Sequence, residues 1–263
     1  MEPLVSIIMS VHNDQDTLKT AIKSIEKQTY SNWEFIIYDD ASTDNSKKIL
    51  ESFSSKNKKI TLISGNLNKG LAYGLNKCIL KSSGNFIARM DADDISYPTR
   101  IEDEMDYLTT HDDISVIGCN LLVFNGKENI GVRKMPERPA KEDFVNGSPF
   151  AHPTVIIRKN ILSKINGYSS KVGRAEDLDL WFRIYEFGCK GYNLQKVLYR
   201  YKELPDDYKK RTIKDGFKTM LVFIKGFKRL NIPIYYYTFA LKPLISSIVP
   251  NKVMIKYHSK KLR

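Results

Sequence analysis

The sequence predicts an α/β protein whose mostly parallel sheet is flanked by helices. Short apolar runs of strand length alternate with helical patterns through the N-terminal part of the chain. This alternation is typical of strand–helix–strand units with right-handed crossovers, which make successive strands parallel. Polar residues follow three of the strands. Since ligands of parallel sheets bind beyond the carboxyl ends of the strands, we expect one site at that rim.

The first element is Leu4–Val11, an apolar run of strand length. Apolar residues at helical spacing predict the helices, and short apolar runs predict the strands. In chain order, the elements expected after Val11 are a helix from Asp16 through Ile25, a strand at Trp33–Tyr38, a helix from Asp44 through Phe53, a strand at Ile60–Ile63, a helix at Gly70–Leu80 and a strand at Phe86–Met90. Further on, Thr154–Arg158 is expected to be a strand, and Arg174–Gly188 contains a helical pattern.

Three carboxylates, Asp91, Asp93 and Asp94, follow the strand Phe86–Met90. Like charges packed together are costly unless a cation neutralises them. Oxygen ligands suit Mg²⁺ or Mn²⁺, and such ions commonly take their remaining ligands from phosphate oxygens. The cluster therefore indicates a metal-bound nucleotide diphosphate. Taken alone, it is equally consistent with an acidic turn that caps the next helix.

Four segments carry a resemblance to a known family: VSIIMSVHN, YDDASTDNS, NKGLAYGLNKCILKSSGNFIARMDADD and AEDLDLWFR. In this order and spacing they resemble the family 2 glycosyltransferases, over roughly residues 3–202. The resemblance implies a GT-A fold and an inverting transfer of sugar from a nucleotide-sugar, most simply a UDP-sugar, to an acceptor hydroxyl. It also implies a nucleotide-sugar-binding half at residues 1–98 and an acceptor half at residues 99–202.

The resemblance places the nucleotide at the ends of the first two strands. Asp40 is expected to accept the imide N–H of uracil, a task that suits a carboxylate because it offers two acceptor oxygens. Ser10 and His12 match the loop that holds the base. Lys69 precedes a helix whose N-terminal amides could face the diphosphate.

The resemblance also assigns the metal site. Asp93 matches the metal ligand, and Asp91 is the first aspartate of the DxD motif, contacting the ribose or the metal through water. The cofactor is then Mn²⁺ or Mg²⁺, which stabilises charge on the departing nucleoside diphosphate. Asp94 is expected to be structural, and Arg100 to brace the carboxylates through a salt bridge.

The candidate general base is Asp177, in the ED motif with Glu176. Both fall in the first turn of a predicted helix, where the helix dipole favours anions without any catalytic role. As a base, Asp177 would remove the proton of the attacking hydroxyl. His152 and Glu176 are further candidates for contact with phosphate or acceptor, and a structural role fits His152 as well. Trp181 is expected in the core.

Charge is concentrated at the C-terminus. The chain carries 42 Lys and Arg against 30 Asp and Glu, a net charge of +12. Residues 201–263 alone hold 15 Lys and Arg against 4 Asp and Glu, a net charge of +11. Lys209–Arg229 mixes lysines with Ile213, Phe217, Leu221, Ile224 and Phe227, which predicts a basic amphipathic helix. We expect the tail at residues 203–263 to lie on the inner face of a bacterial membrane, although helices packed on the catalytic domain would also explain the pattern.

The cellular compartment and the class of acceptor can also be predicted from the sequence. Three cysteines without pairing or zinc spacing, and an N-terminus without a secretory pattern, predict a cytoplasmic protein. A peripheral position at the membrane favours a polyprenyl-diphosphate-linked glycan acceptor, as in the capsule, exopolysaccharide and O-antigen enzymes of the family.

Three other functions remain open at this level. A sugar-1-phosphate nucleotidyltransferase would share the sheet and the metal, but the loop after the first strand, SVHNDQD, has no glycine. A nucleic-acid binder would explain the positive charge, but that charge lies in an apolar tail, so we expect no nucleic acid partner. An inactive, lipid-binding relative would keep the same motifs.

Overall fold

The computed structural model describes residues 2–204, 212–250 and 253–254. Within these residues, nine strands form a single sheet in the order β3-β2-β1-β4-β8-β6-β9-β5, with β7 paired to β6. The strands are β1 (Val5–Val11), β2 (Trp33–Asp39), β3 (Ile60–Ser64), β4 (Phe86–Arg89), β5 (Ile95–Ser96), β6 (Ile114–Phe124), β7 (Asn129–Arg133), β8 (Ile156–Arg158) and β9 (Lys190–Lys202).

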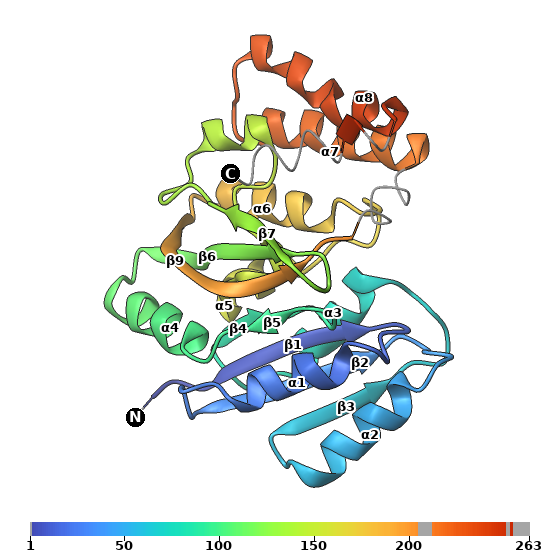
Figure 1. Cartoon of the computed structure of the whole chain (residues 1–263). Coiled ribbons are helices and arrows are strands. Elements are labelled where there is room, and N and C mark those ends of the chain that lie inside the picture. The colour runs from blue at the N-terminus through green and yellow to red at the C-terminus, as the bar shows by residue number, and fades with distance from the viewer. Residues whose placement is uncertain (1, 205–211, 251–252, 255–263) are drawn as a thin grey trace.

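Helices flank this sheet, as expected for an α/β fold (Figure 1). The α-helices are α1 (Leu18–Glu26), α2 (Ser46–Lys56), α3 (Leu71–Lys81), α4 (Arg100–Thr110), α5 (Lys159–Lys164), α6 (Glu176–Glu186), α7 (Ile213–Arg229) and α8 (Lys242–Ile248). Short 3-10 helices are η1 (Lys141–Asn146), η2 (His152–Thr154) and η4 (Ile234–Leu241). The strands and helices predicted between residues 4 and 90 are all present.

The first four strands are parallel, and their side chains alternate between two apolar layers. Ile7 and Met9 of β1 pack with α1, α2 and α4 on one face of the sheet. Ile8, between them, packs with α3, α5 and α6 on the other face. Burial on both faces explains why these strands read as nearly continuous apolar runs.

The C-terminal strands join the same sheet by antiparallel pairs. β8 lies between β4 and β6 and is antiparallel to both. β9 runs parallel to β6 and then pairs with the short β5, opposing Ile95 with Arg200. This return brings the end of β9 against the loop that follows β4, so two distant parts of the chain meet at the acidic cluster.

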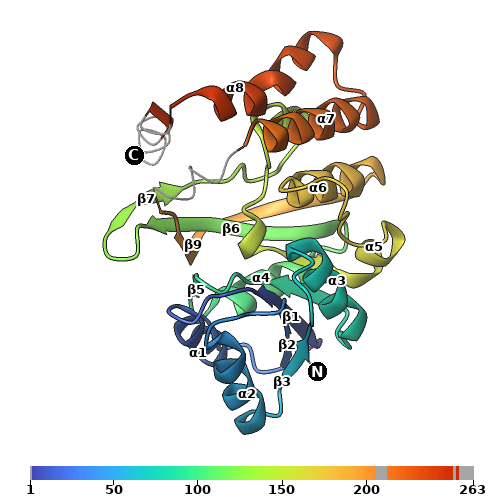
Figure 2. The same cartoon turned by 90° about the vertical axis from the view of Figure 1, so that its right-hand side faces the viewer.

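Helix α7 covers α6 on the side away from β1–β3 (Figure 2). Its inner face packs Phe223 and Phe227 edge-on against Phe182 of α6. Gly226 permits this approach, because a Cβ there would stand 2.2 Å from the Phe182 ring. The predicted amphipathic helix Lys209–Arg229 is thereby confirmed from Ile213 onward, while Lys209 itself lies outside the described residues.

The apolar face of α7 differs from the expected one. Phe227 is buried, but Ile213, Phe217, Leu221 and Ile224 are exposed, by 61%, 49%, 38% and 37%. The packed face is instead built by Val222, Phe223 and Phe227, with two glycines. Helix α7 therefore has a packed apolar face and a second apolar row open to its surroundings. Across the residues described, we find no helix with the length and apolarity needed to span a bilayer.

Candidate active site

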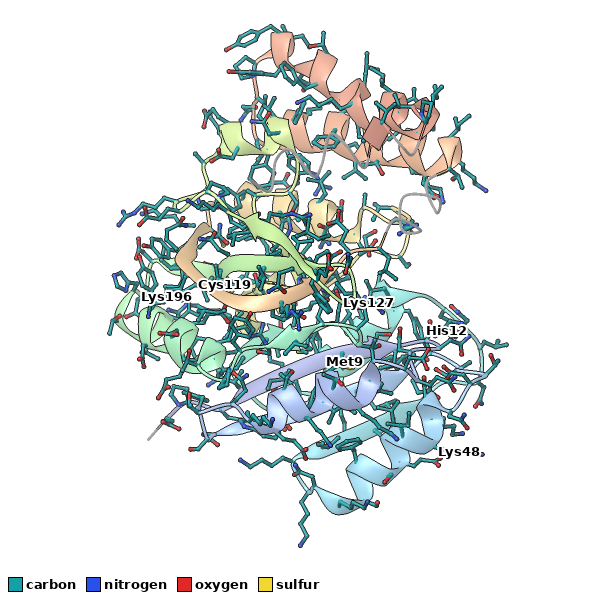
Figure 3. All side chains as sticks on the ribbon, viewed as in Figure 1. Met9, His12, Lys48, Cys119, Lys127 and Lys196 are labelled. Atoms are coloured by element: carbon teal, nitrogen blue, oxygen red, sulfur yellow. The ribbon has the colours of Figure 1, made fainter. Side chains whose placement is uncertain are left out.

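The site is built where β1, β2 and β4 end. These strands are adjacent and parallel, so their carboxyl ends share one rim, as the sequence predicts. His12 follows β1 and lies at the right-hand edge of the view in Figure 3, whereas Met9, earlier in the same strand, lies inside. Asp40 follows β2, and Asp91 follows β4.

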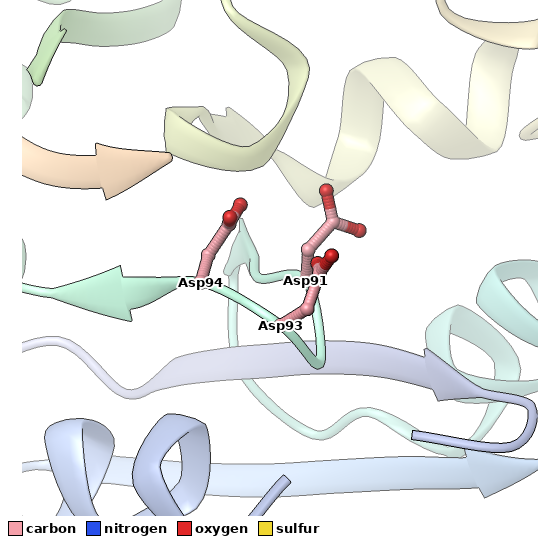
Figure 4. A group of neighbouring side chains, drawn as sticks. All are labelled: Asp91, Asp93 and Asp94. Atoms are coloured by element: carbon pink, nitrogen blue, oxygen red, sulfur yellow. The ribbon is translucent and has the colours of Figure 1, made fainter. Parts of the chain in front are cut away.

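Asp91, Asp93 and Asp94 point to the same side of the loop between β4 and β5 (Figure 4). Each offers a carboxylate oxygen, and these oxygens all lie within 4.8 Å of one another. Burial, followed by the negative charges of Asp91 and Asp14, raises the pKa of Asp93 to about 6. Burial and the two neighbouring aspartates also raise the pKa of Asp94 well above its usual value.

Asp94 provides a test of whether this cluster suits a cation. Its Oδ1 accepts the backbone N–H of Lys202 at 2.7 Å, whereas Oδ2 is buried without a hydrogen-bond partner among the described atoms. An unpartnered carboxylate oxygen beside two other carboxylates is strongly disfavoured unless a positive charge approaches it. The donor set is all oxygen, so the residues present fit Mg²⁺ or Mn²⁺. Asp94, expected to be structural, belongs to this set as much as its neighbours do.

Arg89 is a site residue that the sequence motifs do not indicate. Its guanidinium is 4% exposed and forms a two-point ion pair with Asp91. Arg100, predicted to brace the carboxylates, is fully buried and donates to the carbonyl oxygens of Arg89 and Pro153, both at 3.1 Å. The Arg100 prediction is therefore wrong. Arg100 lies on α4, under the strand, and Arg89 is the residue that reaches the rim.

Asp40 organises the loop that begins α3. It is 2% exposed, and its carboxylate accepts the backbone N–H groups of Lys69 and Gly70 at 2.8 and 2.7 Å. Its carbonyl oxygen lies 2.9 Å from Nδ1 of His12. The two amides at the start of α3 are thus engaged by Asp40, which leaves the Lys69 side chain, lying over the Tyr73 ring, as the basic group of this loop.

Ser10 lies at the contact between β1 and α3. A Cβ on Gly74 of α3 would approach the Ser10 hydroxyl to 2.1 Å, so the helix and strand touch closely at this point. Asp14, in the loop after β1, is a second acidic residue that the motifs do not mark. Burial first, and then the charge of Asp91, raises its pKa, which places a fourth carboxylate near the cluster.

Glu176 and Asp177 occupy the first turn of α6, as predicted. Burial and the neighbouring Asp177 raise the pKa of Glu176 to about 7. Burial raises the pKa of Asp177, although the backbone N–H of Leu178 and the charge of Arg89 oppose this effect. A carboxylate whose pKa has moved toward neutrality is well matched to accepting a proton.

His152 and Tyr168 form a pair beneath the start of α6. Nε2 of His152 and the Tyr168 hydroxyl lie 2.8 Å apart. Burial, followed by the charge of Arg89, lowers the pKa of His152 well below its usual value, so the ring is neutral. Trp181 meets the His152 ring edge-on and is 0% exposed, which confirms its place in the core.

These residues form a candidate active site, and comparison with known proteins identifies the class of protein that carries it. Residues 6–179 match the family described as glycosyl transferase family 2. The chain belongs to this family. The predicted resemblance is therefore confirmed.

Two curated relatives show how far the similarity extends. EpsE of Bacillus subtilis strain 168 is 38% identical over 263 residues, covering 99% of this chain and 95% of that protein. The Escherichia coli enzyme WfgD, a UDP-Glc:alpha-D-GlcNAc-diphosphoundecaprenol beta-1,3-glucosyltransferase, is 32% identical over 182 residues, covering 69% of each chain.

Solved structures confirm the GT-A fold. S. aureus TarS 1-349 in complex with UDP superposes with a TM-score of 0.71 at 17% identity, covering 92% of this chain and 70% of that one. The mannosyltransferase PcManGT from Pyrobaculum calidifontis, in complex with GDP-Man and Mn²⁺, gives 0.70 at 16% identity, covering 99% and 80%.

Proposed function

We propose that this chain transfers a sugar from a UDP-sugar to a hydroxyl of a lipid-linked glycan, with inversion at the anomeric carbon, during the synthesis of a bacterial surface polysaccharide. Membership of glycosyl transferase family 2 supports the reaction class. The similarity to WfgD, which transfers glucose from UDP-Glc to a GlcNAc-diphosphoundecaprenol acceptor, supports the choice of donor and of a lipid-linked acceptor. The family motifs support inversion of configuration at the anomeric carbon of the transferred sugar.

One observation carries the proposal: Arg89 connects the donor rim to the candidate base. Its guanidinium pairs with Asp91, and its charge also acts on Glu176 and Asp177. The strand alternation explains this position, because Arg89 follows Ile87 by two residues and so points to the face that α6 covers. The acidic cluster and the ED motif thus belong to one site.

In this site, Asp177 would act on the acceptor. The acceptor hydroxyl attacks the anomeric carbon, its proton passes to the Asp177 carboxylate, and the bond from that carbon to the UDP oxygen breaks. Proton transfer of this kind contributes roughly 10²–10⁴ in rate. Asp91, Asp93 and Asp94 would hold Mn²⁺ or Mg²⁺, which when bound neutralises charge on the departing diphosphate.

Asp40, His12 and Ser10 would position the nucleotide. Asp40 already accepts two backbone amides, and the remaining lone pairs of its oxygens could take the uracil imide. Lys69 would lie beside the diphosphate. His152 would be a neutral hydrogen-bonding group near the reacting sugar, fixed by Tyr168.

The experiment that tests this function is calorimetric titration of the whole chain with UDP, with Mn²⁺ present or with EDTA, and with GDP and TDP as controls. We expect UDP to bind only when Mn²⁺ is present. Tighter binding of GDP would keep the transferase class and reject the uracil assignment. Failure of every nucleoside diphosphate to bind would contradict the transferase proposal.

The acceptor assignment is supported by the outer face of α7. Its exposed apolar row, Ile213, Phe217, Leu221 and Ile224, runs beside lysines of the same helix. Apolar side chains flanked by basic residues suit an anionic membrane surface, where each basic residue contributes about 1 kcal/mol. We therefore propose a peripheral position on the cytoplasmic face of the membrane, where the chain would meet a lipid-linked acceptor.

A further inference from the structure

Tyr199 of β9 contacts the loop that carries the acidic cluster. It is 0% exposed, and its hydroxyl accepts the backbone N–H of Asp91 at 3.2 Å, from a position 108 residues further along the chain. The Asp91 carboxylate is held separately, by the ion pair with Arg89. The backbone and the side chain of Asp91 are therefore fixed by different residues, and the backbone contact comes from β9.

Two further hydrogen bonds join the end of β9 to the same loop. The N–H of Lys202 donates to Asp94 Oδ1 at 2.7 Å, and the N–H of Tyr97 donates to the carbonyl oxygen of Leu198 at 3.0 Å. Between these two contacts the loop forms β5, which pairs with β9. The path of the loop from residue 91 to residue 97 therefore follows the end of β9.

Arg100 packs against the Tyr199 ring. It is 0% exposed, and the Cζ of its guanidinium lies 5.3 Å from the centre of that ring. Its Nη1 also donates to the carbonyl oxygens of Arg89 and Pro153, both at 3.1 Å. One guanidinium thus joins Tyr199 to the end of β4 and to the turn that contains His152. A planar cation that lies over an aromatic ring and is fixed by two carbonyl groups restricts the position of the ring.

The acidic cluster needs such support because its members repel one another. The carboxylate oxygens of Asp91, Asp93 and Asp94 lie within 4.8 Å of one another, and like charges at this spacing favour a wider separation. A rigid set of oxygen ligands favours a small cation, because Mg²⁺ requires ligands at about 2.0–2.1 Å, whereas Ca²⁺ accepts flexible ligands at about 2.3–2.6 Å. The rigidity of the loop therefore influences both the affinity of the site and its preference for ion size.

We propose that Tyr199 is a positioning residue for the metal. Its hydroxyl holds the backbone of Asp91 so that the three carboxylates converge on an ion of the size of Mg²⁺ or Mn²⁺, and Arg100 keeps the tyrosine ring in place. The inference rests on the proposed function and adds to it a residue that acts through the backbone of Asp91 rather than as a ligand.

The test removes a single oxygen atom. Tyr199→Phe deletes the hydroxyl and keeps the ring against which Arg100 packs. The control, Tyr30→Phe, deletes the hydroxyl of another buried tyrosine, which donates to the carbonyl oxygen of Pro3 near the start of β1, the end away from the cluster. Electron paramagnetic resonance on the full chain measures Mn²⁺ binding with and without UDP. Displacement of Mn²⁺ by Mg²⁺ and by Ca²⁺ gives the affinities of these two ions, and urea unfolding gives the stability of each variant.

We expect Tyr199→Phe to weaken Mn²⁺ binding about three- to tenfold, the effect of one lost hydrogen bond, and to lower the preference for Mg²⁺ over Ca²⁺ by about threefold or more. Tyr30→Phe should bind all three ions as the native chain does. Native ion binding by Tyr199→Phe would overturn the assignment. Equal weakening of Mg²⁺ and Ca²⁺ binding would also overturn it, since a loss of stability alone affects both ions alike.

Arg100→Lys is a second variant, which keeps the buried charge but loses the planar fork that reaches two carbonyl groups and the ring. It should also lower the preference for Mg²⁺ over Ca²⁺, and it decides the matter if Tyr199→Phe does not unfold cooperatively. Loss of cooperative unfolding in both variants would show a structural role alone and overturn the proposal. A native chain that binds Mn²⁺ but no UDP contradicts the proposed function and leaves the ion measurements to test Tyr199, whereas a native chain that binds no Mn²⁺ under either condition overturns the role of Tyr199 as well.

Discussion

Arg89 is a buried cation in a strand that otherwise reads as apolar. Burial of an unpaired guanidinium is costly, and here the two-point contact with Asp91 offsets that cost. The same charge acts on His152 and Asp177 across the site. One side chain therefore contributes to the electrostatics of both the acidic cluster and the ED motif, and neither the strand pattern nor the DxD motif reveals it.

Asp177→Asn is the direct test of the base. An amide cannot accept the proton of the attacking hydroxyl, so we expect transfer or donor hydrolysis to fall by about 10² or more. Binding of UDP should be unchanged, because the substitution keeps the shape of the side chain and lies away from the nucleotide loop. Turnover is followed by UDP release from a panel of UDP-sugars, with Glu186→Gln at the other end of α6 as the control. Normal turnover by Asp177→Asn would reject the base assignment.

Glu176→Gln tests the coupling of the two acids. Burial raises the pKa of Asp177, so its ionised, proton-accepting form is lost as the pH falls through that pKa. Burial and the charge of Asp177 raise the pKa of Glu176 to about 7, so Glu176 takes up its proton first as the pH falls and carries little charge where Asp177 titrates. We therefore expect Glu176→Gln to move the acid limb of the rate profile by less than about half a pH unit. The pH dependence of UDP-sugar hydrolysis measures it, and a limb that moves to lower pH by about one unit or more would show that Glu176 is still ionised when Asp177 takes up its proton.

At the scale of elements, two hydrogen bonds join α3 to the loop that precedes α6. Asn76 of α3 donates to the carbonyl oxygen of Tyr168 and accepts its backbone N–H, both at 2.8 Å. Gly167 allows these two hydrogen bonds to form, since its φ of +61° favours glycine and a Cβ would stand 2.4 Å from Asn76 Oδ1. The side chain of Tyr168, the residue whose backbone Asn76 binds, in turn forms a hydrogen bond with His152.

Gly226→Ala tests the packing of α7 on α6. The added Cβ would stand 2.2–2.3 Å from atoms of the Phe182 ring, which is itself packed against Phe144 and Phe223. Overpacking of this kind costs about 1–3 kcal/mol, more than the gain in helix propensity from replacing glycine. Urea unfolding measures the loss, with Lys225→Ala on the exposed side as control. Equal or greater stability of Gly226→Ala would show that α7 does not sit on Phe182 as described.

At the scale of the whole molecule, the exposed row of α7 predicts weak binding to anionic vesicles. We expect the chain to sediment with vesicles that contain phosphatidylglycerol and much less with vesicles of phosphatidylcholine alone. The double substitution Phe217→Ser and Leu221→Ser should weaken sedimentation about tenfold, because each apolar side chain contributes on the order of 1 kcal/mol when partly buried. Ile130→Ser, which changes an exposed residue of β7, should have no effect. Sedimentation independent of lipid charge and of the α7 residues would reject the membrane proposal.

The sequence by itself determined the order of elements in the N-terminal half and the positions of the acids. Apolar runs of strand length and apolar residues at helical spacing are local patterns, so β1 to β4 and α1 to α3 can be predicted from the order of residues alone. Asp91, Asp93 and Asp177 stand in short motifs at fixed spacing, and the match to the family follows from them. The roles of these acids in catalysis and metal binding stay predictions.

Only the tertiary structure decided which charges face one another. Asp94 Oδ2 is buried without a hydrogen-bond partner among the described residues, and Oδ1 accepts the backbone N–H of Lys202, more than 100 residues further along the chain. Arg89 likewise acts on Asp177, which is distant in sequence. The two apolar faces of α7 could not be separated by spacing, because both repeat with the helical period and only contact with α6 selects one. The cavity of about 610 Å³ lined by α7 and α8 exists only because these helices pack over the loop that contains Ser148. Burial, pKa and cavity shape depend on this long-range packing, and no local pattern in the sequence encodes them.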